Sequence, residues 1–170
     1  KINNYTKSEK KQNPILFFAI SKKTLIVADN IAKYYALDID TGKVLWSKSN
    51  TAPFNSQLKV YKDRFFIIDY QNILRAYLVK NSKEIWNVKT EDSLVRTQKK
   101  LSMVIVEDKI YFNNSLGDIS AVDVKSGELL WQSPTQSNLI LDESFFLKTS
   151  DIIADKQTLY FSNDNFAVFN

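Results

Sequence analysis

The chain has 170 residues, of which 44% are hydrophobic and 13% aromatic, a composition that indicates one folded domain and excludes a disordered tail. It contains no cysteine and no histidine, which excludes disulfides, thiol catalysis, a Ser–His–Asp triad, histidine-ligated metals and c-type haem attachment. The net charge is +4, but residues 1–12 hold four lysines against one glutamate, so the remaining chain lacks the basic face that nucleic-acid binding requires.

Residues 1–13 form a polar, basic leader, which we predict to be a flexible arm or linker. This leader has no apolar h-region, so no signal peptide is expected in it. No apolar run in the chain approaches the roughly 20 residues that a membrane helix needs. We therefore expect any attachment to a membrane to depend on an anchor outside these residues.

Three units follow the leader, at residues 14–50, 51–90 and 91–135. Each holds four short runs of β-branched and aromatic residues separated by turn residues, a pattern that predicts four β-strands per unit. The strands of the first unit are predicted at Ile15–Ile20, Leu25–Ala28, Tyr34–Asp38 and Val44–Lys48. Those of the second are predicted at Leu58–Tyr61, Phe65–Asp69, Leu74–Val79 and Glu84–Val88. Those of the third are predicted at Met103–Val106, Ile110–Asn113, Ile119–Val124 and Leu129–Gln132.

A fourth unit, at residues 136–170, is incomplete. Its Leu159–Phe161 and Ala167–Phe169 match the second and third strands of the other units. Four strands per repeat of 40–50 residues are typical of a propeller blade, and the unbroken apolar second strands indicate sheets covered on both faces. We predict an all-β fold, a partial β-propeller of about four four-stranded antiparallel blades from a ring of seven or eight. The open blade edges are expected to allow self-association.

The three tryptophans, Trp46, Trp86 and Trp131, each close a similar segment. The first and third segments share an alanine, an aspartate and a glycine at fixed distances before the tryptophan, whereas the second has Leu78 and Ser82 in place of the aspartate and glycine. We predict a positive φ at the glycines, turn amides bonded to the aspartates, and a looser or differently shaped turn in the second unit. The residues assigned to structural docking are Ala36, Asp38, Gly42, Trp46, Ala76, Trp86, Ala121, Asp123, Gly127 and Trp131.

The pattern Ala-x-Asp-x-x-Thr/Ser-Gly-x-x-x-Trp resembles the tryptophan-docking motif of quinoprotein-like β-propellers, over about residues 14–170. WD40 repeats fit poorly because no aspartate follows a tryptophan, and kelch repeats fit poorly because the chain has only three glycines. The chain is most similar to the BamB-like lipoproteins of the outer-membrane β-barrel assembly machinery. That resemblance implies a non-catalytic, periplasmic, outer-membrane-associated scaffold with no cofactor and a BamA-like barrel protein as partner.

The alternative within the same family is a dehydrogenase that uses pyrroloquinoline quinone (PQQ). Such enzymes hold the quinone with Ca²⁺, a catalytic aspartate and a vicinal cysteine pair, and this chain has no cysteine. We interpret its carboxylates as isolated, solvated turn residues rather than calcium ligands, and we assign no catalytic, metal or cofactor residue. The carboxylates considered are Asp63, Asp69, Glu107, Asp108, Asp118, Asp142, Glu143, Asp151 and Asp155.

Binding in such a fold is expected in the linkers between blades, because the strands are committed to packing. Three linkers stand out, at residues 49–57, 89–100 and 133–147. Leu94 and Arg96 keep part of a Leu-x-Leu-Arg pattern by which BamB-like proteins contact their partner, and we assign them to partner binding. The alternative is an ordinary linker whose leucine packs into the body of the domain. A propeller that senses or adheres to an unknown extracytoplasmic ligand remains a third hypothesis.

Overall fold

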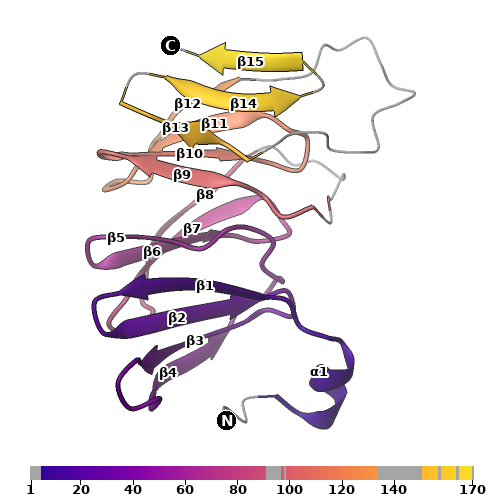
Figure 1. Cartoon of the computed structure of the whole chain (residues 1–170), viewed down its shortest axis with the longest axis vertical. Coiled ribbons are helices and arrows are strands. Elements are labelled where there is room, and N and C mark those ends of the chain that lie inside the picture. Colours follow the sequence, from indigo (N-terminus) through magenta and orange to yellow (C-terminus); the bar gives the residue numbers. More distant parts are fainter. Residues whose placement is uncertain are drawn as a thin grey trace.

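The computed structural model describes residues 5–90, 97, 99–133, 151–156, 158–163 and 165–169. They form four antiparallel sheets stacked along the long axis of the molecule (Figure 1). Blade 1 consists of β1 (Leu16–Ser21), β2 (Thr24–Asp29), β3 (Lys33–Asp38) and β4 (Val44–Ser49). Blade 2 consists of β5 (Lys59–Tyr61), β6 (Arg64–Ile68), β7 (Ile73–Leu78) and β8 (Glu84–Lys89). Blade 3 consists of β9 (Met103–Val106), β10 (Lys109–Asn113), β11 (Ile119–Asp123) and β12 (Leu129–Ser133). Blade 4 contributes β13 (Ile153–Ala154), β14 (Leu159–Asn163) and β15 (Asn165–Phe169).

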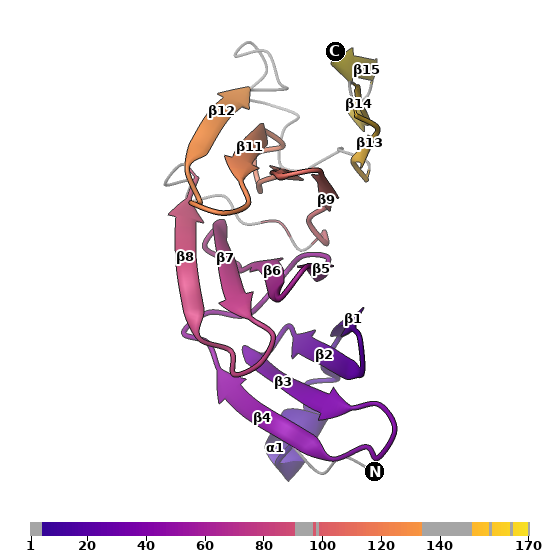
Figure 2. The same ribbon diagram turned by 90° about the vertical axis from the view of Figure 1, so that its left-hand side faces the viewer.

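Each blade is a meander in which sequential strands pair. The first strands, β1, β5, β9 and β13, lie on one side of the stack, and the last strands, β4, β8 and β12, lie on the other (Figure 2). The predicted strands of the first three blades begin and end within one or two residues of the observed ones. The prediction of an all-β, partial propeller of four antiparallel blades is confirmed, with three strands described in the fourth blade.

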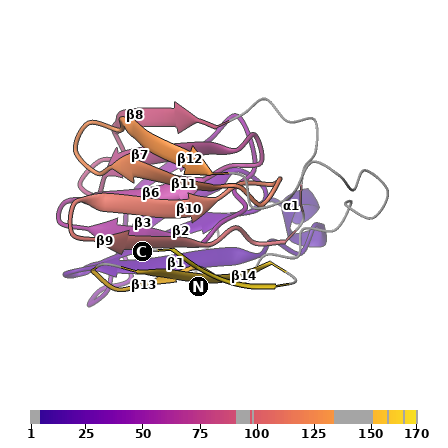
Figure 3. The same cartoon turned by 90° about the horizontal axis from the view of Figure 1, so that it is seen from above.

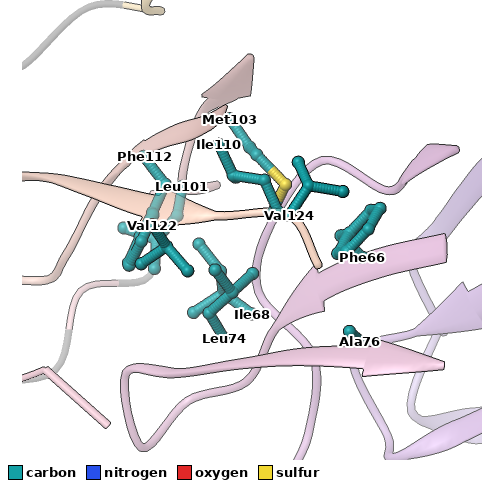
Figure 4. Close-up of a cluster of buried hydrophobic side chains, with 10 residues drawn as sticks. All are labelled: Phe66, Ile68, Leu74, Ala76, Leu101, Met103, Ile110, Phe112, Val122 and Val124. Carbon is teal, nitrogen blue, oxygen red and sulfur yellow. The ribbon is translucent and has the colours of Figure 1, made fainter. Parts of the chain in front are cut away.

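The hydrophobic core lies between the blades. At the junction of blades 2 and 3, Phe66, Ile68 and Leu74 face Ile110 and Phe112, and all five are buried (Figure 4). A second cluster joins blades 1 and 2, and a third joins blades 3 and 4. Because every middle sheet packs on both faces, β6 is buried along nearly its whole length, as its unbroken apolar run predicts.

The turn before each outer strand has one shape in all three blades. Gly42 and Gly127 have φ values of 68° and 76°, which confirms the predicted left-handed positions. The prediction of a different turn in blade 2 was wrong, because Ser82 has a φ of 56° and its amide donates to the Leu78 carbonyl at 2.9 Å. Gly127 makes the corresponding bond to the Asp123 carbonyl at 3.0 Å. The backbone bonds therefore impose this turn even where the side chain disfavours it.

Replacing Ser82 with glycine is expected to raise the free energy of unfolding by about 0.5–1 kcal/mol, because an L-residue in the left-handed region costs about 1–2 kcal/mol and glycine loses more entropy on folding. The gain should appear as a higher urea midpoint with an unchanged slope. The control is Ser49→Gly at the exposed end of β4, where glycine should only destabilise. A loss of stability in Ser82→Gly would contradict the strain argument.

The expectation of a flexible arm was wrong for residues 5–12, which fold against blade 1. Helix α1 (Lys7–Lys11) begins with a capping box between Thr6 and Glu9, and it lies to one side of the stacked sheets (Figure 3). The Tyr5 hydroxyl donates to the Asp29 carboxylate at 2.6 Å, and Lys33 Nζ lies 2.8 Å from a carboxylate oxygen of Glu9. The Tyr5 ring packs on a buried cluster of Val27, Tyr35 and Leu37. The polar composition of residues 1–13 gave no indication of these contacts.

Docking of α1 should weaken as the pH falls below about 4.5. The hydrogen bond from Lys33, followed by that of the Thr6 amide, lowers the pKa of Glu9 to about 2 from its usual 4.5. A carboxylate with a depressed pKa contributes stability that is fully present above its unfolded pKa and is lost as the pH falls through its folded pKa. Protection of the amides of residues 6–11, taken relative to the intrinsic exchange rate at each pH, should therefore be constant above about pH 4.5 and fall between that pH and about pH 2. In Glu9→Gln this dependence should be absent; an unchanged profile would exclude Glu9 as its cause.

Candidate interaction surface

Trp46 joins blade 1 to blade 2. Its indole stacks on Phe65 with ring centroids 5.8 Å apart, and its Nε1–H donates to the Val79 carbonyl at 2.9 Å. Its own blade supplies Tyr34, which meets the indole edge-on. Directly across the sheet stands Ala36, which is fully buried and leaves room for the ring.

Trp86 repeats this arrangement between blades 2 and 3. Its Nε1–H donates to the Val124 carbonyl at 3.1 Å, and Ala76 is its partner across the sheet. Its ring lies on Gly127 of the next blade, where a Cβ would come within 2.6 Å of Cδ2 of Trp86. Gly127 therefore has two functions, because its positive φ permits the turn and its missing side chain admits the indole.

Trp131 is more exposed, at 38%, and contacts Tyr111 of its own blade, with Ala121 opposite. The carbonyl that corresponds to those of Val79 and Val124 belongs to Asn170, which lies outside the described residues.

The aspartates of the turn segment behave as their sequence predicts. The Asp38 carboxylate accepts from the Thr41 hydroxyl and amide, and these bonds hold the pKa of Asp38 below its usual value. The Asp123 carboxylate accepts from the amide and hydroxyl of Ser126, and its pKa is lowered in the same way. Both aspartates are half-buried turn formers.

Sequence reasoning misjudged Asp69, which it assigned to the solvated carboxylates. Asp69 is fully buried, and its Oδ2 accepts from Arg75 Nε at 2.9 Å. Arg75 Nη1 also donates to Glu84 at 3.0 Å. Asp118 is buried as well and accepts from Gln132 and Asn114. The turn positions of these residues gave no sign that side chains of their own blade and of the preceding linker would cover them.

A repeated turn former was also missed. Asp29, Asp69 and Asn114 each accept two amides, from the residues two and four positions later, in the loop between the second and third strands. Each stands 17 residues before its tryptophan, so the spacing was visible in the sequence.

The first linker is committed to packing. Phe54 and Ser56 are fully buried, and Ala52 and Asn55 are nearly so. Phe54 meets Tyr34 edge-on between blades 1 and 2. Because so much of the first linker is buried, its exposure does not support the expectation that it binds a partner.

The second linker is fixed on both sides of residues 91–96. Before them, the amide and hydroxyl of Thr90 donate to the Asn72 carbonyl. After them, Asn55 Nδ2 donates to the carbonyls of Thr97 and Lys99 at 2.7 and 3.1 Å. Asn55, Asn72 and Thr90 are all buried. The predicted partner-binding residues, Leu94 and Arg96, lie outside the described residues, as does nearly all of the third linker, including Asp142 and Glu143.

Within the described part of the chain, no three acidic side chains converge in a way that could hold a metal ion. A pocket of about 250 Å³ opens between the turns of blades 2 and 3, where Tyr61, Arg64, Asp108 and Lys125 mix both charges. Arg64 is already bonded there to the carbonyls of Val124 and Lys125. The single helix among the described residues is too short to cross a membrane.

Comparison with solved structures finds the same fold in proteins of 14–18% identity. BamB from Moraxella catarrhalis matches with a TM-score of 0.71 and 15% identity, over 87% of this chain and 46% of that one, so this chain spans about half its length. The computationally designed protein Ika4 matches over 91% of this chain and 90% of its own, with 14% identity and a TM-score of 0.70. A europium-containing methanol dehydrogenase matches over 76% of this chain and 27% of its own, with 18% identity and a TM-score of 0.58.

Among curated protein sequences, none matches the chain significantly. The family model described as outer membrane protein assembly factor BamB matches residues 6–168, which is nearly the whole chain. The matched segment includes all three tryptophans and the two blade junctions that Trp46 and Trp86 form. This chain therefore belongs to the BamB family of quinoprotein-like β-propellers.

Proposed function

We propose that this chain is a non-catalytic protein-interaction scaffold that acts in outer-membrane β-barrel assembly, on the periplasmic side of the outer membrane. Its family supports this role, since the matching model is that of an assembly factor. Its tryptophans support it too. The Nε1–H groups of Trp46 and Trp86 donate to backbone carbonyls of the neighbouring blades, which favours a structural role for these rings over stacking on a cofactor.

The observation that carries the proposal is the anchoring of the second linker. Thr90 and Thr97 are both tied to buried asparagines, so the chain on either side of residues 91–96 is fixed to the blades. A short segment with fixed ends loses little conformational entropy on binding. Exposed Lys99 and Lys100 follow it and add positive charge. We propose that Leu94 and Arg96 contact a BamA-like barrel protein at this site.

The double variant Leu94→Ala/Arg96→Ala is expected to weaken binding to a purified BamA-like protein by at least tenfold, because it removes an arginine, a residue type enriched among interface hot spots, and a leucine side chain whose apolar area the interface would bury. Binding should be measured by calorimetry or surface plasmon resonance. The control is Leu45→Ala/Lys43→Ala, a similar pair of exposed residues on blade 1. Equal affinity of both variants would refute the site, and no binding by the parent chain would refute the function.

A further inference from the structure

The pocket of about 250 Å³ lies between the hairpin turns of blades 2 and 3. Blade 2 lines it with Tyr61 and Arg64, at the two ends of the β5–β6 turn, and blade 3 with Val124 and Lys125, from the β11–β12 turn. The second linker starts and finishes at the opposite ends of the strands, so the pocket is separate from it. Sites for drug-sized ligands have about 300–1,000 Å³, so this one suits a smaller molecule or a single residue of a peptide.

Arg64 is fixed at this pocket. Its Nη1 donates to the carbonyls of Val124 and Lys125, both at 2.9 Å, and its side chain is 24% exposed. Both bonds use one nitrogen, and the Nε–Nη2 edge makes no hydrogen bond to another described residue. The carboxylate of Asp63, which is 75% exposed, lies 3.9 Å from Nε. A guanidinium edge in this state can bind a carboxylate through two parallel hydrogen bonds.

The charges around the pocket favour a ligand with one negative charge. Three cations and two carboxylates line it, namely Lys62, Arg64, Lys125, Asp63 and Asp108. Asp108 is already engaged, because its Oδ1 accepts from the Tyr61 hydroxyl at 3.3 Å and lies 3.5 Å from Lys62 Nζ. Among the lining residues, the charges of Arg64 and Lys125 are therefore opposed only by Asp63, which leaves one positive charge to be balanced.

The wall of the pocket is apolar. Val124 is 2% exposed, and Tyr61 packs on the buried cluster to which Val124 belongs, so core contacts hold both in place. The corresponding turn of blade 1 has neither the aromatic ring nor the guanidinium, because Ser21 and Thr24 stand at the positions of Tyr61 and Arg64. The repeat itself therefore does not require these two residues.

We propose that this pocket binds a carboxylate joined to a small apolar group, with the carboxylate on the Nε–Nη2 edge of Arg64 and the apolar group against Tyr61 and Val124. Lys125 adds a second positive charge. Asp63 is displaced from Arg64, which costs little because an exposed ion pair is weak. A free aromatic or aliphatic acid carries this chemistry, and so does an apolar residue at the C-terminus of a peptide. The site does not depend on the function proposed above.

The test is an NMR titration of the whole ¹⁵N-labelled chain with N-acetylphenylalanine and with 3-phenylpropanoate. Each should move the Arg64 Nε–H signal and the Lys125 amide signal in a saturable way, with a dissociation constant of roughly 1 mM for so few atoms. N-acetylphenylalaninamide has the same ring without the charge and should bind at least about tenfold more weakly. Tighter binding of N-acetylphenylalanine would identify the ligand as a peptide terminus, and tighter binding of 3-phenylpropanoate would identify it as a free acid.

Four variants locate the site. Arg64→Lys should weaken the binding of N-acetylphenylalanine by about tenfold, because an ammonium lacks the planar fork. Asp63→Asn should strengthen it, because the competing carboxylate is gone, and this gain does not arise from a loss of blade packing. Lys125→Met should weaken it by about threefold, whereas Lys80→Met, at the matching exposed position in blade 2, should not. No saturable shift, equal affinity for the acid and the amide, weaker binding in Asp63→Asn, or equal losses in the two lysine variants would overturn the proposal.

Discussion

The variant Arg75→Met should lose about 3–5 kcal/mol of unfolding free energy, because removing one partner of a buried ion pair leaves the other charge uncompensated. Asp69 is fully buried, and the Arg75 side chain is only 12% exposed. Methionine fills much the same volume, so the loss reports the unpaired Asp69 carboxylate rather than a cavity. Urea unfolding followed by circular dichroism measures it.

Two further variants make this result specific. Lys23→Met removes an ion pair with Asp40 whose side chains are 78% and 57% exposed, and should cost at most about 1 kcal/mol. Asp69→Asn combined with Arg75→Met should recover part of the loss, because the neutral amide keeps an acceptor for the amides of Gln71 and Ile73. If Arg75→Met loses as little unfolding free energy as Lys23→Met, the Asp69–Arg75 ion pair does not stabilise the blade.

The variant Gly127→Ala should be far more harmful than Gly42→Ala, although the two glycines have nearly the same φ. Both substitutions place an L-residue in the left-handed region, at a cost of about 1–2 kcal/mol. Only at Gly127 does the new methyl group meet the indole of Trp86, and overpacking adds about 1–3 kcal/mol. The difference in urea midpoints between the two variants therefore measures the contact between blade 2 and blade 3.

Fluorescence gives an independent view of the same contact. The indole of Trp86 should become more exposed in Gly127→Ala and shift its emission to longer wavelength, with Trp46 and Trp131 replaced by phenylalanine in both proteins. In Gly42→Ala on that background the emission should not move. Equal destabilisation by the two alanines would show that Trp86 can leave Gly127 without loss.

The sequence was sufficient for the blades, because their signal is local and repeated. Runs of β-branched and aromatic residues, turn residues and three regularly spaced tryptophans located twelve strands within one or two residues. It failed at Ser82, because the bonds from Ser82 and Leu78 to the surrounding turn outweigh the side-chain preference of one residue. The shape of this turn in blade 2 was therefore better predicted from the corresponding turns of blades 1 and 3 than from the residue types of blade 2 itself.

Burial of polar residues was harder to predict, because it depends on which segment covers which. The residue types around Asp69 are those of an exposed turn. The side chains that donate hydrogen bonds to its carboxylate nevertheless come from Arg75 and from Asn50 in the preceding linker. Tyr5 and Glu9 likewise find Asp29 and Lys33 across 24 residues. Contacts of this kind produce no repeating pattern in the sequence, so they become visible only in the three-dimensional arrangement of the blades.

The division of each junction between two blades affects how such a chain can lengthen. Trp86 lies in the last strand of one blade, and Gly127, 41 residues later, lies in the next blade against its indole. Duplication of blade 3 would supply the new junction with an indole and with the glycine on which an indole lies, whereas duplication of blade 2 would place Trp86 against Ser82, which has the side chain that Gly127 lacks. A deletion that begins inside one blade and ends inside another would leave an indole facing the wrong partner.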